Sequence, residues 1–154
     1  MFSFVFGLCY FNGSGVEKDD MEAVKWFHKA AKQGIAMAQT DLATCYMMGI
    51  GVEKDEEAAK WYRMAAGQGD ADARYQLGGC YYSGTGVEKD DKEAVKWYRM
   101  AAEQGNAMAQ TDLATCYMIG SGVEKDEKEA AKWYRMAAEQ GDEDAKKALE
   151  QLGY

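Results

Sequence analysis

Apolar and small residues recur along the chain at the spacing of an α-helix, in stretches that end at glycines. One stripe consists of Ala73, Leu77, Cys80 and Tyr81. The next stripe consists of Ala94, Trp97, Tyr98 and Ala101. The members of each stripe share one face of a helix. The pattern therefore predicts two amphipathic helices joined by a turn, because the glycines between them permit the positive φ that ends a helix.

The same pair of stripes returns along the chain every 35 or 36 residues. Tryptophan marks the second stripe at Trp26, Trp61, Trp97 and Trp133. Cysteine marks the first stripe at Cys9, Cys45, Cys80 and Cys116. The turn motif Gly-x-Gly-Val-Glu-Lys-Asp begins at Gly13, Gly49, Gly84 and Gly120. Markers that share one period indicate tandem helix pairs, which must stack because one pair cannot bury its own apolar face.

The repeats divide a single all-α domain, residues 1–154, into four helix pairs and a closing helix. The predicted boundaries are 1–34, with an incomplete start, 35–69, 70–105, 106–141 and 142–154. About nine helices are expected. The chain contains no proline and 17 glycines, a composition that suits helices joined by short turns.

Capping residues mark the helix starts. Asp19, Asp90 and Asp126 are each followed by Glu three positions later, the spacing of a capping box with Asp as the capping residue. The second repeat departs from this pattern, because Ile35 replaces the Asp or Asn found before the first helix elsewhere and Asp55 lacks the glutamate. A lost cap costs about 1 kcal/mol, so we expect this repeat to fray first.

The third repeat carries a recognisable set of residues. They are Ala73, Leu77, Gly78, Tyr81, Gly84, Gly86, Val87, Lys89, Asp90, Ala94, Trp97, Tyr98, Ala101, Ala102, Gly105 and Ala109. This pattern, repeated over essentially the whole chain, resembles the Sel-1-like repeat, which is similar to the tetratricopeptide repeat. The resemblance implies a right-handed solenoid of helix pairs and a role as an adaptor in protein complexes.

The charge of the chain argues against two classes of partner. The net charge is −8 and the isoelectric point is about 4.7. Nucleic acids and anionic membranes both attract basic surfaces, so neither is an expected partner. No run of 18 apolar residues occurs, so membrane insertion is not expected. The apolar N-terminus lacks the basic start of a signal peptide, and together with unpaired cysteines this favours a cytoplasmic location.

Candidate catalytic and metal-binding residues are few. Cysteines one repeat apart would lie about 20 Å from each other, too far for a disulfide, so we expect them to be small apolar core residues. The single His28 occupies a surface position where other repeats have arginine. We therefore predict no enzyme, metal or cofactor. A penicillin-binding or β-lactamase-like activity, known in the cysteine-rich subgroup of the resembled family, remains a less favoured alternative.

By analogy with tetratricopeptide repeats, the first helix of each pair should line a concave groove. The predicted partner-binding residues, rich in Met, Thr and aromatic types, are Phe4, Leu8, Phe11, Met37, Thr40, Thr44, Met47, Tyr75, Tyr82, Met108, Thr111, Thr115 and Met118. Such residues suit an adaptable protein or peptide interface, although tighter packing that buries them is an equal alternative. Self-association through Phe2, Phe4 and Val5 is a second hypothesis, because the first helix is apolar nearly all round.

Overall fold

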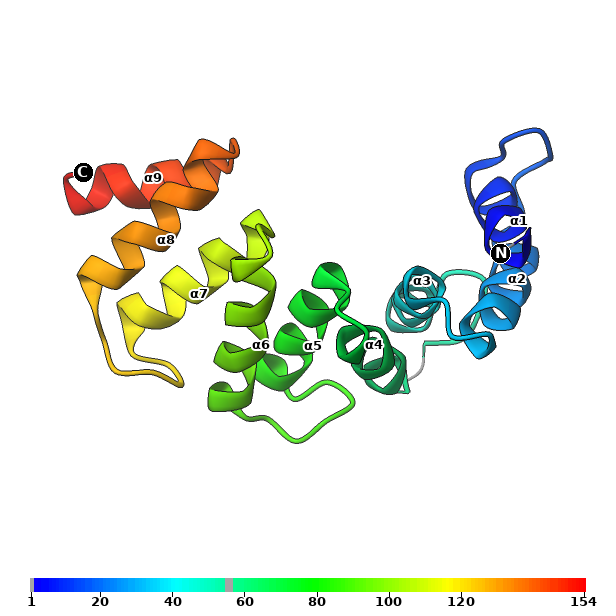
Figure 1. Ribbon diagram of the computed structural model, residues 1–154, viewed down its shortest axis with the longest axis horizontal. Coiled ribbons are helices and arrows are strands. Elements are labelled where there is room, and N and C mark those ends of the chain that lie inside the picture. Colours follow the sequence, from blue (N-terminus) through cyan, green and yellow to red (C-terminus); the bar gives the residue numbers. More distant parts are fainter. Residues whose placement is uncertain (1, 55–56) are drawn as a thin grey trace. The chain divides into compact units, whose positions relative to one another are not determined.

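The computed structural model describes residues 2–54 and 57–154. Within these ranges it contains nine helices and no strand, which confirms the all-α prediction (Figure 1). The helices are α1 (Phe2–Asn12), α2 (Asp20–Lys32), α3 (Ala36–Met48), α4 (Ala58–Gly67), α5 (Ala71–Ser83), α6 (Asp91–Glu103), α7 (Ala107–Ile119), α8 (Glu127–Glu139) and α9 (Glu143–Leu152).

The chain forms two compact units, one ending at Ala73 and the other beginning at Arg74. In the first unit α1 packs on α2, α2 on α3 and α3 on α4. In the second unit α6 packs on α7, α7 on α8 and α8 on α9. Each of these helices therefore lies against the next one along the chain, as expected for stacked helix pairs.

Small side chains form most of the core. The second helix of each pair ends in two alanines, and Ala30, Ala31, Ala65, Ala66, Ala101, Ala102 and Ala137 are buried. The first helices of the second, third and fourth repeats each contribute one fully buried leucine, Leu42, Leu77 and Leu113. Side chains this small let helix backbones approach closely, and the larger aromatic rings fill the space that is left.

The ring at the centre of each pair is accommodated in two ways, which alternate along the chain. In the first and third repeats a helical glycine faces the ring: a Cβ on Gly7 would lie 2.5 Å from Phe27, and one on Gly78 would lie 2.6 Å from Tyr98. In the second and fourth repeats, alanine replaces this glycine. There the Tyr62 and Tyr134 hydroxyls form hydrogen bonds of 2.9 Å with threonines of α3 and α7.

The predicted Asp caps are confirmed, whereas the predicted capping box is wrong in its second hydrogen bond. The Asp19, Asp90 and Asp126 side chains each accept a bond from the amide three residues later, at 3.0–3.1 Å. The return bond of a capping box is not formed, because the amide of each capping Asp donates to a tyrosine carbonyl at the end of the preceding helix. The glutamates instead form ion pairs with lysines three positions later.

Two buried glutamines, which the sequence analysis did not single out, connect three helices in each unit. Gln39 of α3 donates to the Ala31 carbonyl at the end of α2, and its own oxygen accepts from Gln68 at the end of α4, at 2.8 Å. Gln110 makes the same bonds to the ends of α6 and α8. The buried amides of Gln39 and Gln110 are thereby satisfied, and each adds a second donor to a helix-end carbonyl that also accepts from a glycine amide.

The first helix of the second repeat starts without a side-chain cap, as predicted from Ile35. The other expected weak point, Asp55, lies outside the described residues. The chain supplies an internal comparison, because α3 and α7 are identical in sequence over residues 36–47 and 107–118. In α7 the Asn106 side chain accepts from the Ala109 amide at 2.8 Å, whereas Ile35 offers no acceptor to Ala38.

We expect the Ala38 amide to exchange with solvent at least about fivefold faster than the Ala109 amide, since a cap contributes about 1 kcal/mol. Native-state hydrogen exchange followed by NMR measures both amides in one sample, and their identical neighbours remove sequence effects on the intrinsic rate. An Ile35→Asn variant should slow exchange at Ala38. Equal protection of the two amides in the original protein would contradict the expectation.

The turn after α3 approaches the start of α2 so closely that only glycine fits. Gly51 has a φ of +68°, and a Cβ there would overlap the Asp20 carbonyl. Gly15, in the same unit, has a φ of +78° but no atom near the place of its Cβ. The two positions therefore share the backbone conformation and differ in the space available.

Replacing Gly15 with Ala should cost about 1 kcal/mol of unfolding free energy, from the left-handed backbone alone. Gly51→Ala should cost about 2–4 kcal/mol, because steric overlap with α2 adds to that term. Urea unfolding of the two variants tests the difference. Similar losses in both would show that the approach of the turn to α2 is not a tight contact in solution.

Candidate functional site

The predicted groove residues lie on the first helices α1, α3, α5 and α7, and none of them is fully buried. Met37 is 60% exposed, Met108 53% and Tyr82 39%. Thr115 is also exposed, and the remaining members are half-buried. Their accessibility leaves them available to a partner, and their role in binding stays a prediction.

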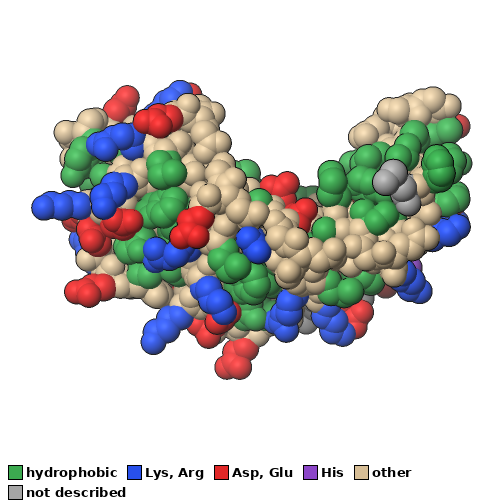
Figure 2. Space-filling view, in the orientation of Figure 1, with side chains coloured by type: hydrophobic (Ala, Val, Ile, Leu, Met, Phe, Trp, Pro, Cys, Tyr) green, Lys and Arg blue, Asp and Glu red, His purple; other side chains and the backbone are tan. Residues whose placement is uncertain are grey.

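The residues proposed for self-association differ from one another. Phe2 is 82% exposed and Val5 50%. Phe4 is half-buried, with its ring centroid 6.0 Å from that of Phe27 on α2. Figure 2 shows hydrophobic side chains gathered at the surface of the region that Figure 1 labels α1.

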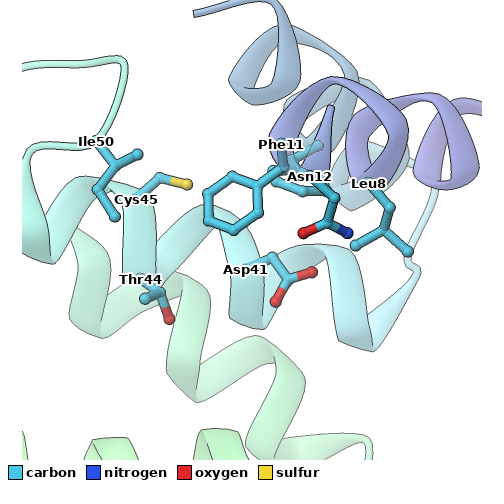
Figure 3. Close-up of a pocket in the computed structure, with 8 residues that line it drawn as sticks. Leu8, Phe11, Asn12, Asp41, Thr44, Cys45 and Ile50 are labelled. Carbon is cyan, nitrogen blue, oxygen red and sulfur yellow. The ribbon is translucent and has the colours of Figure 1, made fainter. Parts of the chain in front are cut away.

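A pocket of about 240 Å³ opens in the first unit, between α1 and α3. It is lined by Leu8, Phe11, Asn12, Phe27, Asp41, Thr44, Cys45 and Ile50. In Figure 3, Leu8, Phe11 and Asn12 of α1 face Asp41 and Thr44 of α3 across the pocket. Three of the predicted groove residues thus meet here, together with a carboxylate that the sequence analysis did not select.

Asp41 is the charged group of this pocket, and its environment opposes ionisation. Burial, together with the like charges of Asp70 and Asp72, raises its pKa from the ordinary value of 3.8 to about 6. No hydrogen bond or ion pair reaches the Asp41 carboxylate from the residues that the structure describes. The sequence offered one signal: Asp41 is the only acidic residue of an otherwise uncharged helix.

The corresponding residue of the second unit, Asp112 on α7, is in a different environment. Burial raises its pKa as well, but the Tyr75 hydroxyl acts as a hydrogen-bond donor to this carboxylate and partly opposes the shift. Burial of the ring, followed by the charge of Asp112 and the interaction with its carboxylate, raises the pKa of Tyr75 to about 12. The two carboxylates therefore stand at equivalent positions, and only Asp112 has a donor.

Comparison with known proteins identifies the family. The pattern described as the Sel1 repeat matches four consecutive segments of the chain, residues 6–35, 36–70, 71–106 and 107–142. The chain belongs to the Sel1 repeat family. No curated protein sequence matches it.

Solved structures agree with this assignment. A Sel1 repeat protein from Oxalobacter formigenes is 43% identical, with a TM-score of 0.87 over 93% of this chain and 59% of its own. A protective antigen of uropathogenic Escherichia coli with an SLR fold is 42% identical, with a TM-score of 0.90 over 93% of this chain and 31% of its own. Helicobacter pylori cysteine rich protein B is 26% identical, with a TM-score of 0.68 over 89% of this chain and 99% of its own.

The chain thus spans about a third and about three-fifths of the length of the first two relatives. Sel1 repeat proteins are generally scaffolds for protein interaction and are typically non-catalytic. In the described part of this Sel1 chain, no helix is long and apolar enough to cross a membrane.

The prediction that the cysteines of this Sel1 chain are core residues is confirmed for three of the four. Cys45, Cys80 and Cys116 are buried, Cys9 is half-buried, and all four are free thiols. Burial raises the pKa of the three buried thiols to about 11, so the reactive thiolate is disfavoured there.

His28 is less exposed than the sequence analysis expected. It is half-buried on α2, with its ring 5.9 Å from that of Trp61 in an edge-to-face arrangement. Burial lowers its pKa. No group of three His, Cys, Asp or Glu residues with a geometry for metal binding occurs among the described residues.

The raised pKa of Asp41 predicts how the free energy of unfolding depends on pH. The folded protein holds the Asp41 proton more tightly than the unfolded chain does, so ionisation removes stability as the pH rises from about 4 to above 6. At pH 7.5, Asp41→Asn should raise the free energy of unfolding by about 1 kcal/mol, after allowance for solvent screening of a partly exposed group. The melting temperature should rise by about 2–4 °C.

Thermal unfolding of both proteins at pH 3.5 and pH 7.5 tests this expectation. The difference should vanish at the lower pH, where Asp41 is protonated in both states. A loss of stability at pH 7.5 would show that the carboxylate makes a favourable interaction in the folded protein.

Proposed function

We propose that this Sel1 repeat chain is a non-catalytic scaffold that binds a peptide or protein segment through the groove residues of its first helices. The observation that carries the proposal is the exposure of large, adaptable side chains on those helices, Met37 and Met108 above all. Methionine fits partners of varied shape, and exposed apolar side chains on a highly charged protein favour an interaction surface. The general role of the family supports the same function.

The chain offers matched controls for a test of this face. Met64 on α4 and Met136 on α8 are 51% and 45% exposed, close to the values for Met37 and Met108. They belong to the second helices of the same two repeats. Replacing each methionine with Glu therefore places one new charge at similar exposure, either on the proposed binding face or away from it.

Peptides selected from a random displayed library against the unaltered protein supply the probes, and their affinities are then measured calorimetrically. Met37→Glu and Met108→Glu should weaken binding at least about tenfold, because a buried unpaired charge costs 1–3 kcal/mol. Met64→Glu and Met136→Glu should leave affinity within about twofold. Greater losses from the α4 and α8 variants would place binding on the other face.

A further inference from the structure

The two units allow equivalent sites to be compared within one chain. Cys9 and Cys80 are 71 positions apart, as are Cys45 and Cys116, so residues 3–54 of the first unit have counterparts 71 positions later in the second. The helix that carries Asp41 has the same sequence as the helix that carries Asp112 except at its last residue, which is Met48 in α3 and Ile119 in α7. Differences between the two sites therefore come from the residues packed around these helices.

Those surrounding residues are more apolar in the first unit. The replacements, from the second unit to the first, are Tyr75 to Phe4, Gly79 to Leu8, Tyr82 to Phe11, Tyr98 to Phe27 and Ser121 to Ile50. Four hydroxyl groups are absent around Asp41, and two large aliphatic side chains, Leu8 and Ile50, are added. The first of these replacements removes the donor that serves Asp112.

The pocket in the first unit thus combines apolar walls with an unpaired carboxylate. An uncharged apolar occupant would remove water from Asp41 without replacing its hydrogen bonds, which is unfavourable. An anionic occupant would meet the charges of Asp41, Asp70 and Asp72. A cationic group on an aliphatic stem satisfies both the walls and the carboxylate.

The nearby cation Lys18 does not pair with Asp41, so the Asp41 carboxylate is open to a cation from a partner. Lys18 forms an ion pair with Asp20 at 3.5 Å and lies 5.6 Å from the centre of the Phe11 ring. A cation therefore already lies over the ring of one aromatic residue of the pocket, while no ion pair joins Lys18 to Asp41 among the described residues.

We infer that this pocket receives a basic side chain, lysine or arginine, of the bound protein segment, with its methylenes against Leu8, Phe11 and Ile50 and its charge on Asp41. The inference rests on the proposed scaffold function for the identity of the partner. It adds a specificity: segments that lack a basic residue at this position should bind more weakly.

The test uses small probes and needs no protein partner. Labelled protein at pH 7.5 is titrated separately with n-pentylammonium, n-pentylguanidinium and n-pentanol, and amide shifts are followed by NMR. We expect saturable shifts on α1 and α3 with at least one cation, at least about tenfold tighter than with n-pentanol. The cation that binds more tightly shows whether lysine or arginine is the preferred residue.

Two variants locate the effect. Asp41→Asn should reduce the affinity for the cation to that of n-pentanol. Phe4→Tyr restores the residue found beside Asp112 and should weaken cation binding several-fold, while its matched control, Tyr75→Phe, should leave binding at the first-unit pocket unchanged. The dispersed amide spectrum of each variant verifies folding.

Three results would overturn the inference: equal affinity for n-pentanol and the cations, unchanged cation binding by Asp41→Asn, or equal shifts around Asp112 and Asp41. The comparison of probes on the unaltered protein decides the matter even if a variant fails to fold. Failure of these probes would leave the methionine test of the scaffold function unaffected, and failure of that test would leave the pocket chemistry in place.

Discussion

Close contact between helix backbones is the constraint on which the rest of this structure depends. Paired alanines at the ends of the second helices are buried because neighbouring helices meet there with no larger side chain between them. At the helix ends the buried side chains of Gln39 and Gln110 donate to carbonyls of the preceding helix, which also accept from the backbone amides of Gly34 and Gly105. Packing and hydrogen bonding are thus satisfied by the same contacts.

The alternation between glycine and alanine shows that all repeats share one helix-pair architecture but pack the central aromatic ring in two ways. Where the first helix has Gly7 or Gly78, an aromatic ring lies directly against its backbone. Where it has alanine, the ring is held through its hydroxyl by a threonine. The structural period is therefore two repeats as well as one, and the carboxylates at positions 41 and 112 are likewise two repeats apart.

The helix pairs, their turns and their Asp caps could be predicted from sequence because they depend on neighbours within a few positions. The return bond of the capping box could not, since the amide of Asp90 finds a carbonyl on the previous helix, at Tyr81. The isolation of Asp41 was missed for a similar reason. Its helix has the same sequence as the one around Asp112, and only residues of other helices, such as Phe4, make the two sites differ.

The near-identity of α3 and α7 has a consequence for how such a protein can acquire new specificity. A helix present in two nearly identical copies can have a different ligand preference in each when only the neighbouring helix differs, as Tyr75 and Phe4 do here. Changes in a few α1 side chains would then be enough to alter recognition without touching the helix that carries the charge. Duplication followed by editing of the adjacent helix offers evolution, or a protein engineer, a short route to new binding.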